Sequence, residues 1–127
     1  GALHEFKKPL RFGLATILGD GRQVISWIHL HDLVQMYIAA IENKAMSGAY
    51  NAVAPIPVTN KVLVLCIAKR KKQFYIPVPV PSFVLKLVLG EMSIEVLKSA
   101  TVSASKISAT GFIFGFPNVV KAIDDLV

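Results

Sequence analysis

Residues 19–33, GDGRQVISWIHLHDL, decide the fold expected for this 127-residue chain. Two glycines around one aspartate, at 19–21, are typical of a tight turn, because glycine readily adopts the positive φ angles that such turns need. The apolar run at 23–28 predicts a short strand, which would form either a hairpin with residues 16–18 or a turn-strand unit. From Leu30 onward the pattern becomes that of a helix.

The segment from Leu30 to Asn43 is the most regularly patterned part of the chain. Its apolar residues recur at three- and four-residue spacing, which places them along one stripe of a helix. His31 or Asp32 lies near the start, where an acidic side chain complements the helix dipole. The stripe consists of Leu33, Val34, Tyr37, Ile38 and Ile41. We therefore expect an amphipathic helix here.

The segments on either side of this helix are shorter. Residues 3–15 can form a helix, which Pro9 would kink or restart. Residues 49–54 predict a strand, and Thr59 is well placed to cap a helix that runs through Arg70.

Proline and small polar residues divide the rest of the chain. Alternate prolines at the end of residues 74–81 require an extended segment, at a sheet edge or outside a sheet. The remaining elements predicted are a helix from a Ser82 cap to Leu89 that Gly90 ends, helical turns at 91–99 and 106–110, and a final helix capped by Asn118. This order predicts one small α/β or α+β domain, with short strands and several helices.

Composition narrows the class of protein. The chain is 54% hydrophobic, enough for a core, but its apolar runs are interrupted well before the roughly 18 residues that a membrane helix needs. Cys66 has no partner for an internal disulfide and lies in an apolar run, which indicates an inert core thiol and fits a cytoplasmic setting.

The net charge of +6 includes one dense cluster at residues 69–72. Cations at the end of a helix complement its dipole, so we interpret the cluster as a solvated helix end. A patch for an anion or nucleic acid is the alternative, but no aromatic residues interleave the cations. We therefore expect neither nucleic acid nor a membrane as a partner.

No complete active site can be assembled from this sequence. The turn at 19–21 has Val24 where the third glycine of a G-x-G-x-x-G loop would stand. None of the three tyrosines has a lysine four positions later, so a Tyr-x-x-x-Lys catalytic pair is absent. The pair His29 and His31 is too small a set for a metal ion. We assign no catalytic residue, no metal site and no cofactor site to this chain.

Residues 19–33 resemble the segment of extended short-chain dehydrogenases/reductases, of the nucleoside-diphosphate-sugar epimerase type, in which a G-x-G turn precedes an aromatic-[IV]-H-x-x-D motif. The run GRQVISWIH at 21–29 is similar to an atypical, cell-division-inhibitor-like branch of these epimerases. Ile25 and Ser26 replace the Arg-Asp pair of many sugar-nucleotide epimerases, and His31 replaces one acid of the branch. Motifs at 48–60, 79–93 and 106–126 extend the likeness over residues 10–127.

The resemblance implies that residues 1–127 form the single C-terminal, substrate-side domain of an NAD(P)-dependent epimerase or reductase. By this resemblance, the Rossmann domain that would hold NAD or NADP is absent from the chain. The start at Gly1 instead of methionine agrees with a fragment of a longer protein. This fragment would bind no cofactor and would be inactive alone. The alternative is a non-catalytic interaction or regulatory module that retains the fold.

Five residues are candidates for contact with a nucleotide-sugar-like or other anionic small molecule. Arg22 can hold a phosphate or carboxylate with two parallel hydrogen bonds, although a solvated turn arginine is an equal alternative. The other four are Ser26, Trp27, His29 and Asn51, for which structural roles compete. We also expect the isolated chain to self-associate, because removing a neighbouring domain uncovers apolar surface.

Overall fold

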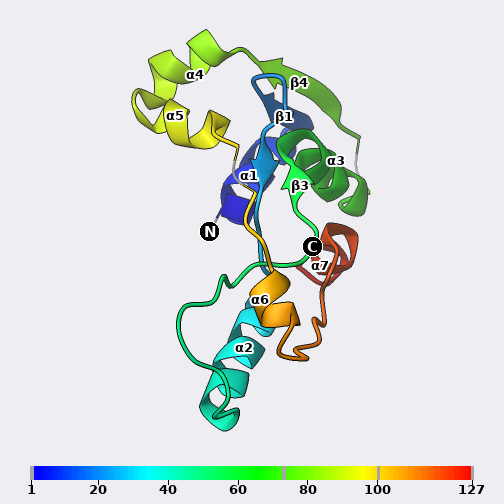
Figure 1. The fold of residues 1–127 in the computed structure, drawn as a ribbon. Coiled ribbons are helices and arrows are strands. Elements are labelled where there is room, and N and C mark those ends of the chain that lie inside the picture. The colour runs from blue at the N-terminus through cyan, green and yellow to red at the C-terminus, as the bar shows by residue number, and fades with distance from the viewer. Residues whose placement is uncertain (1, 73, 100, 127) are drawn as a thin grey trace.

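A computed structural model describes residues 2–72, 74–99 and 101–126 (Figure 1). Within these ranges the chain forms seven helices and four short strands, which confirms the mixed α/β fold class. The helices are α1 (Ala2–Leu10), α2 (Leu30–Glu42), α3 (Asn60–Arg70), α4 (Ser82–Leu89), α5 (Met92–Leu97), α6 (Ser105–Ser108) and α7 (Val119–Leu126). The strands are β1 (Leu14–Leu18), β2 (Val24–Ile25), β3 (Val58–Thr59) and β4 (Ile76–Val80).

Helix α3 lies at the centre of the larger core. It begins as predicted, because the Oγ1 of Thr59 accepts a hydrogen bond from the backbone N–H of Val62 at 3.3 Å. One side of the helix packs against β1, and α1 and α7 also contact it. The fully enclosed residues of this core are Leu10, Ala15, Val64, Ile67, Ala68 and Ile123.

Strands β1 and β4 form a parallel pair, in register from Leu14 with Ile76 to Leu18 with Val80. Pro77 and Pro79 lack the N–H that a further neighbouring strand would need, so β4 lies at the edge, as the prolines predicted.

Of the two alternatives predicted around residue 20, the turn-strand unit is the one observed. Gly19 and Gly21 have φ angles of 61° and 71°, and β2 beyond them pairs antiparallel with β3. The hairpin is wrong because β1 takes β4 as its partner, and the N–H of Gly19 still donates to the carbonyl oxygen of Val80 at 2.8 Å.

Helix α2 lies at the end of the molecule opposite α4 and α5 (Figure 1). Its cap is the side chain of His29, whose Nδ1 accepts the N–H of His31 at 2.9 Å, and not an acidic residue. Met36 packs with Ala104 and Ile107 in a second, smaller core.

The strand predicted at residues 49–54 is wrong for the described structure. A strand needs a neighbour to pair its N–H and C=O groups. At residues 49–54, the N–H of Ala54 donates to the carbonyl oxygen of Trp27 at 2.7 Å, but this backbone bond does not extend into a strand pair.

The C-terminal third is helical. Ser82 is the first residue of α4 and not its cap, since Pro81 occupies the cap position. Gly90, with a φ angle of 60°, ends α4, and the Oδ1 of Asn118 accepts the N–H of Lys121 at the start of α7, both as predicted. In the part of the chain that the structure describes, no helix combines the length and apolar character needed to cross a membrane.

Candidate functional site

An open pocket with a cavity volume of about 680 Å³ lies beside the turn at residues 19–21. Three segments that are distant in the sequence form its wall: the turn, the start of α4, and the residues that follow α5. The lining residues are Gly19, Asp20, Arg22, Gln23, Pro81, Ser82, Leu97 and Ser99. The pocket therefore exists only in the folded chain.

Gln23 joins two of these segments. Its buried Nε2 donates to the carbonyl oxygens of Leu18, at 3.1 Å, and Val96, at 3.2 Å. One residue later, the N–H of Val24 donates to the Oγ of Ser99 at 2.8 Å. These bonds fasten the end of α5 to the turn, so the wall has a defined shape.

Gly21 is required by space as well as by its φ angle. A Cβ atom at this position would lie 2.5 Å from the Cγ2 of Ile17 and 2.8 Å from the Cβ of Lys61, which is closer than real Cβ contacts. The N–H of Lys61 also donates to the carbonyl oxygen of Gly21 at 3.0 Å. The start of α3 thus packs directly on the turn and holds it in place.

Arg22 is the predicted candidate that the structure places at this pocket. Its backbone N–H donates to the Oδ1 of Asp20 at 2.9 Å, which orients the turn. Among the described residues its guanidinium forms no ion pair, and the side chain is exposed. The group is therefore free to meet an anion, although the carboxylate of Asp20 lines the same pocket.

Ser26 and Asn51 lie beside the segment that links α5 to α6, and Trp27 lies beside Ile56. The Oγ of Ser26 accepts the N–H of Val102 at 3.0 Å, and the Nδ2 of Asn51 donates to the carbonyl oxygen of Ser103 at 3.2 Å. The Nε1 of Trp27 donates to the carbonyl oxygen of Ile56 at 2.7 Å. None of the three lines the pocket next to Arg22, and each holds a neighbouring segment.

His29 is buried and both of its ring nitrogens are engaged. Nδ1 accepts the N–H of His31, so the other nitrogen carries the hydrogen and donates to the Oδ2 of Asp125 at 2.8 Å. The ring also stacks on Phe116, with 3.9 Å between centroids. This geometry matches the structural alternative for His29, a hydrogen-bonded corner between β2 and α2.

Asp32 has a role that the sequence did not reveal. Only 1% of it is exposed, and its two carboxylate oxygens accept the N–H groups of Gly115 and Phe116 at 2.8 and 2.9 Å. Each carboxylate oxygen of Asp32 therefore accepts one backbone N–H, and the two bonds hold the 112–116 loop against α2. From the sequence, an acidic residue in the first turn of a helix indicates only a contact with the helix start. The actual partners of Asp32 lie 83 and 84 positions away, where no local pattern points to them.

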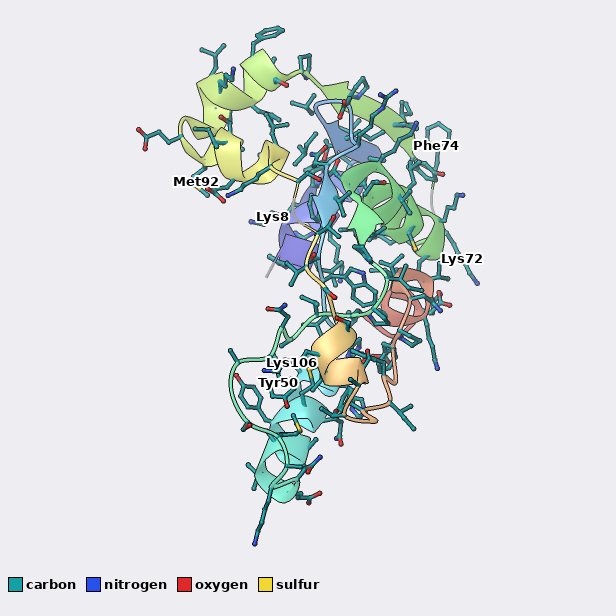
Figure 2. The ribbon with its side chains drawn as sticks, viewed as in Figure 1. Lys8, Tyr50, Lys72, Phe74, Met92 and Lys106 are labelled. Carbon is teal, nitrogen blue, oxygen red and sulfur yellow. The ribbon has the colours of Figure 1, made fainter. Side chains whose placement is uncertain are left out.

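Lys106 holds the loop at residues 47–51, after α2. The Nζ of Lys106 donates to the carbonyl oxygen of Ala49 at 2.6 Å and lies 4.3 Å from the centre of the Tyr50 ring (Figure 2). A cation over an aromatic face is attracted by the ring quadrupole. These contacts shape the loop at 47–51 in the absence of a strand there.

Cys66 lies on α3, outside the pocket. It is half-buried among the residues that pack on the larger core. Burial, together with the nearby Asp124 carboxylate, raises the pKa of its thiol, and Lys69 opposes that shift. The result agrees with the inert thiol that the sequence predicted.

Comparison with known proteins finds relatives of this chain. Residues 80–126 match the family described as Domain of unknown function (DUF1731). An epimerase family protein of Staphylococcus aureus (strain MRSA252) is 37% identical over 127 residues, and one of Staphylococcus haemolyticus (strain JCSC1435) is 37% identical over 130 residues. Over its whole length this chain is therefore similar to part of these epimerase family proteins.

A solved structure supports the same relationship. The human epimerase family protein SDR39U1 (isoform2), in a crystal structure with NADPH, has a TM-score of 0.89 and 30% identity, and the match covers 98% of this chain. The chain spans 42% of the length of that protein and of each of the two staphylococcal relatives. The epimerase family fold is thus shared over nearly the whole of this chain.

Proposed function

We propose that this chain is the substrate-binding part of an NAD(P)-dependent epimerase- or dehydratase-like oxidoreductase, and that it is inactive alone. The observation that carries the proposal is the pocket at Arg22, where an exposed guanidinium lies among three segments, two of which are hydrogen-bonded to each other. A guanidinium at such a site suits a phosphate or carboxylate, as in a nucleotide-sugar-like substrate. The relation to epimerase family proteins supports the reaction class.

The cofactor in this proposal is held by a part of the protein outside these 127 residues. The human relative was crystallised with NADPH, but the residues present here do not fit a dinucleotide. A pyrophosphate needs free N–H groups at a helix start after a glycine-rich turn. The turn at 19–21 leads instead into β2, and the starts of α2 and α3 are occupied by the caps His29 and Thr59.

The same proposal accounts for the apolar face of α2 and for the segment after it, which belongs to no sheet. Tyr37 and Ile41 are 67% and 81% exposed, and residues 49–54 form no strand here. Both features favour a neighbour that would cover the helix and pair with that segment. We propose that the cofactor-binding part of a single longer protein is that neighbour, and that the protein works in the cytoplasm, where one unpaired cysteine stays reduced.

Calorimetric titration of the 127-residue chain with NADPH tests whether the cofactor is bound outside these residues. We expect no measurable heat of binding, because the chain lacks a pyrophosphate cradle. A micromolar dissociation constant would show that the chain binds the cofactor itself and would refute the proposal.

Titration with inorganic pyrophosphate, followed by NMR, tests the pocket. We expect shifts around residues 19–23, and Arg22→Ala should weaken binding by about 1.5–3 kcal/mol, because a charge-assisted contact is lost. Arg11→Ala is the control, since Arg11 is also exposed but lies outside the pocket. Equal affinity in the Arg22 and Arg11 variants would favour the alternative, a non-catalytic interaction module.

A further inference from the structure

Helices α4 and α5 form a hairpin that presents apolar side chains to solvent. Leu85 and Ser93 are buried within the hairpin, and the Oγ of Ser93 donates to the carbonyl oxygen of Gly90 at 2.7 Å, which closes the bend. Met92, labelled in Figure 2, is the first residue of α5 after the bend. The exposed residues are Phe83 (65%), Leu87 (82%), Val88 (75%), Met92 (66%) and Ile94 (65%). Large apolar side chains in such number on two short helices mark an interaction surface.

The total surface of the chain supports at least one missing interface. Its accessible area is 8085 Å², whereas a self-contained monomer of its mass exposes about 6,600 Å². The difference of roughly 1,500 Å² exceeds the 800 Å² or so that one partner buries in a standard interface. The α2 end and the α4–α5 end both contribute, and they lie at opposite ends of the molecule (Figure 1).

The charges of the hairpin indicate what covers it. Lys86 and Lys98 balance Glu91 and Glu95, so the hairpin is neutral in a chain whose net charge is +6. A two-fold symmetric contact requires a patch that complements itself, because each residue meets the same surface in the partner. An apolar, neutral patch with both signs at its rim meets this requirement, whereas an acidic or basic partner would find no opposite net charge here.

We propose that two copies of this chain associate through their α4–α5 hairpins about a two-fold axis. The apolar residues of one hairpin pack against those of the other, and lysines at the rim face glutamates of the second copy. The α2 end stays free in this dimer, so the cofactor-binding part inferred above can still occupy it. The dimer itself does not depend on the proposed function.

Light scattering coupled to size exclusion, at tens of micromolar, tests the dimer. We expect the mass of two chains, and Leu87→Lys should raise the dissociation constant at least about tenfold, because a lysine at the centre of an apolar contact loses its hydration. Phe12→Lys and Ile41→Lys are the controls, since these residues are 83% and 81% exposed but lie outside the hairpin. Circular dichroism would confirm that all three variants fold.

Hydrogen exchange at low and high protein concentration gives a second measurement without a variant. We expect slower exchange at high concentration in residues 82–97 and unchanged exchange in residues 30–42. A monomer at all concentrations would overturn the proposal. So would an association that Ile41→Lys abolishes and Leu87→Lys leaves intact, because the α2 end would then be the contact.

Discussion

The burial of helices α2 and α3 is the reverse of what their sequence patterns predict. Helix α2 has the most regular apolar stripe of the chain, yet Tyr37 and Ile41 on that stripe are 67% and 81% exposed. Helix α3 carries apolar residues on several faces, yet Val64 and Ile67 on it are 1% and 0% exposed. The better amphipathic helix is therefore the less buried one.

The difference lies in what each helix contacts. Helix α3 is packed between β1 and helices α1 and α7, so most of its faces are covered. Helix α2 is held by the cap at His29, by the buried Asp32 and by Met36 in the smaller core, while Tyr37 and Ile41 on its stripe face solvent. An apolar stripe predicts that a helix will be covered, but the partner that covers it need not lie in the same chain.

Paired truncations on the two helices should give the largest contrast. Ile67→Ala leaves a cavity in the larger core and should lower the free energy of unfolding by about 2–5 kcal/mol. Ile41→Ala removes an exposed side chain and should change it by less than about 0.5 kcal/mol. Urea denaturation of both variants measures this, and comparable losses would mean that the α2 stripe is buried in solution.

Asp32→Ala tests the polar attachment of α2. The variant leaves the N–H groups of Gly115 and Phe116 without their acceptor, so we expect a loss of about 1–3 kcal/mol. Asp20→Ala is the matched control, because Asp20 accepts one exposed N–H, from Arg22, and should matter less. If the two variants are equally stable, the 112–116 loop is held by other contacts.

The smallest expected effect is on thiol chemistry. Because the raised pKa of Cys66 leaves less thiolate at neutral pH, iodoacetamide should alkylate it more slowly than a free cysteine, and the rate should rise as pH approaches that pKa. A cysteine on α2, from Ile41→Cys in a Cys66→Ser chain, should react like a free thiol. Equal rates at pH 7.5 would place Cys66 in solvent.

The candidate site was predictable only in part. Arg22 was identified from its turn and its chemistry, and the structure places it at the pocket. The other side of that pocket comes from residues 81–82 and 97–99, and Gln23, which fastens α5 to the turn, gave no signal within an apolar run. His29 bonds to Asp125, 96 positions away, and no pattern in the sequence indicates that partner.

The sequence by itself determined the local features. These are the caps at Thr59 and Asn118, the stop at Gly90, the turn at 19–21 and the edge position of the proline-rich strand. Each depends on backbone sterics and hydrogen bonds within a few residues, which one residue type settles in any surrounding. The sequence alone likewise shows that these 127 residues contain no glycine-rich loop and no Tyr-x-x-x-Lys pair.

Only the tertiary structure decided which elements meet. Strand β1 pairs with β4, 62 positions away by register, instead of with the strand that follows it, and residues 49–54 form no strand although their sequence favours one. Strand pairs, pockets and buried carboxylates join groups that lie tens of residues apart, so their free energy depends on all competing partners at once. A short sequence pattern says nothing about competing partners. The apolar stripe of α2, the most regular of the chain, is therefore exposed although its pattern predicts burial.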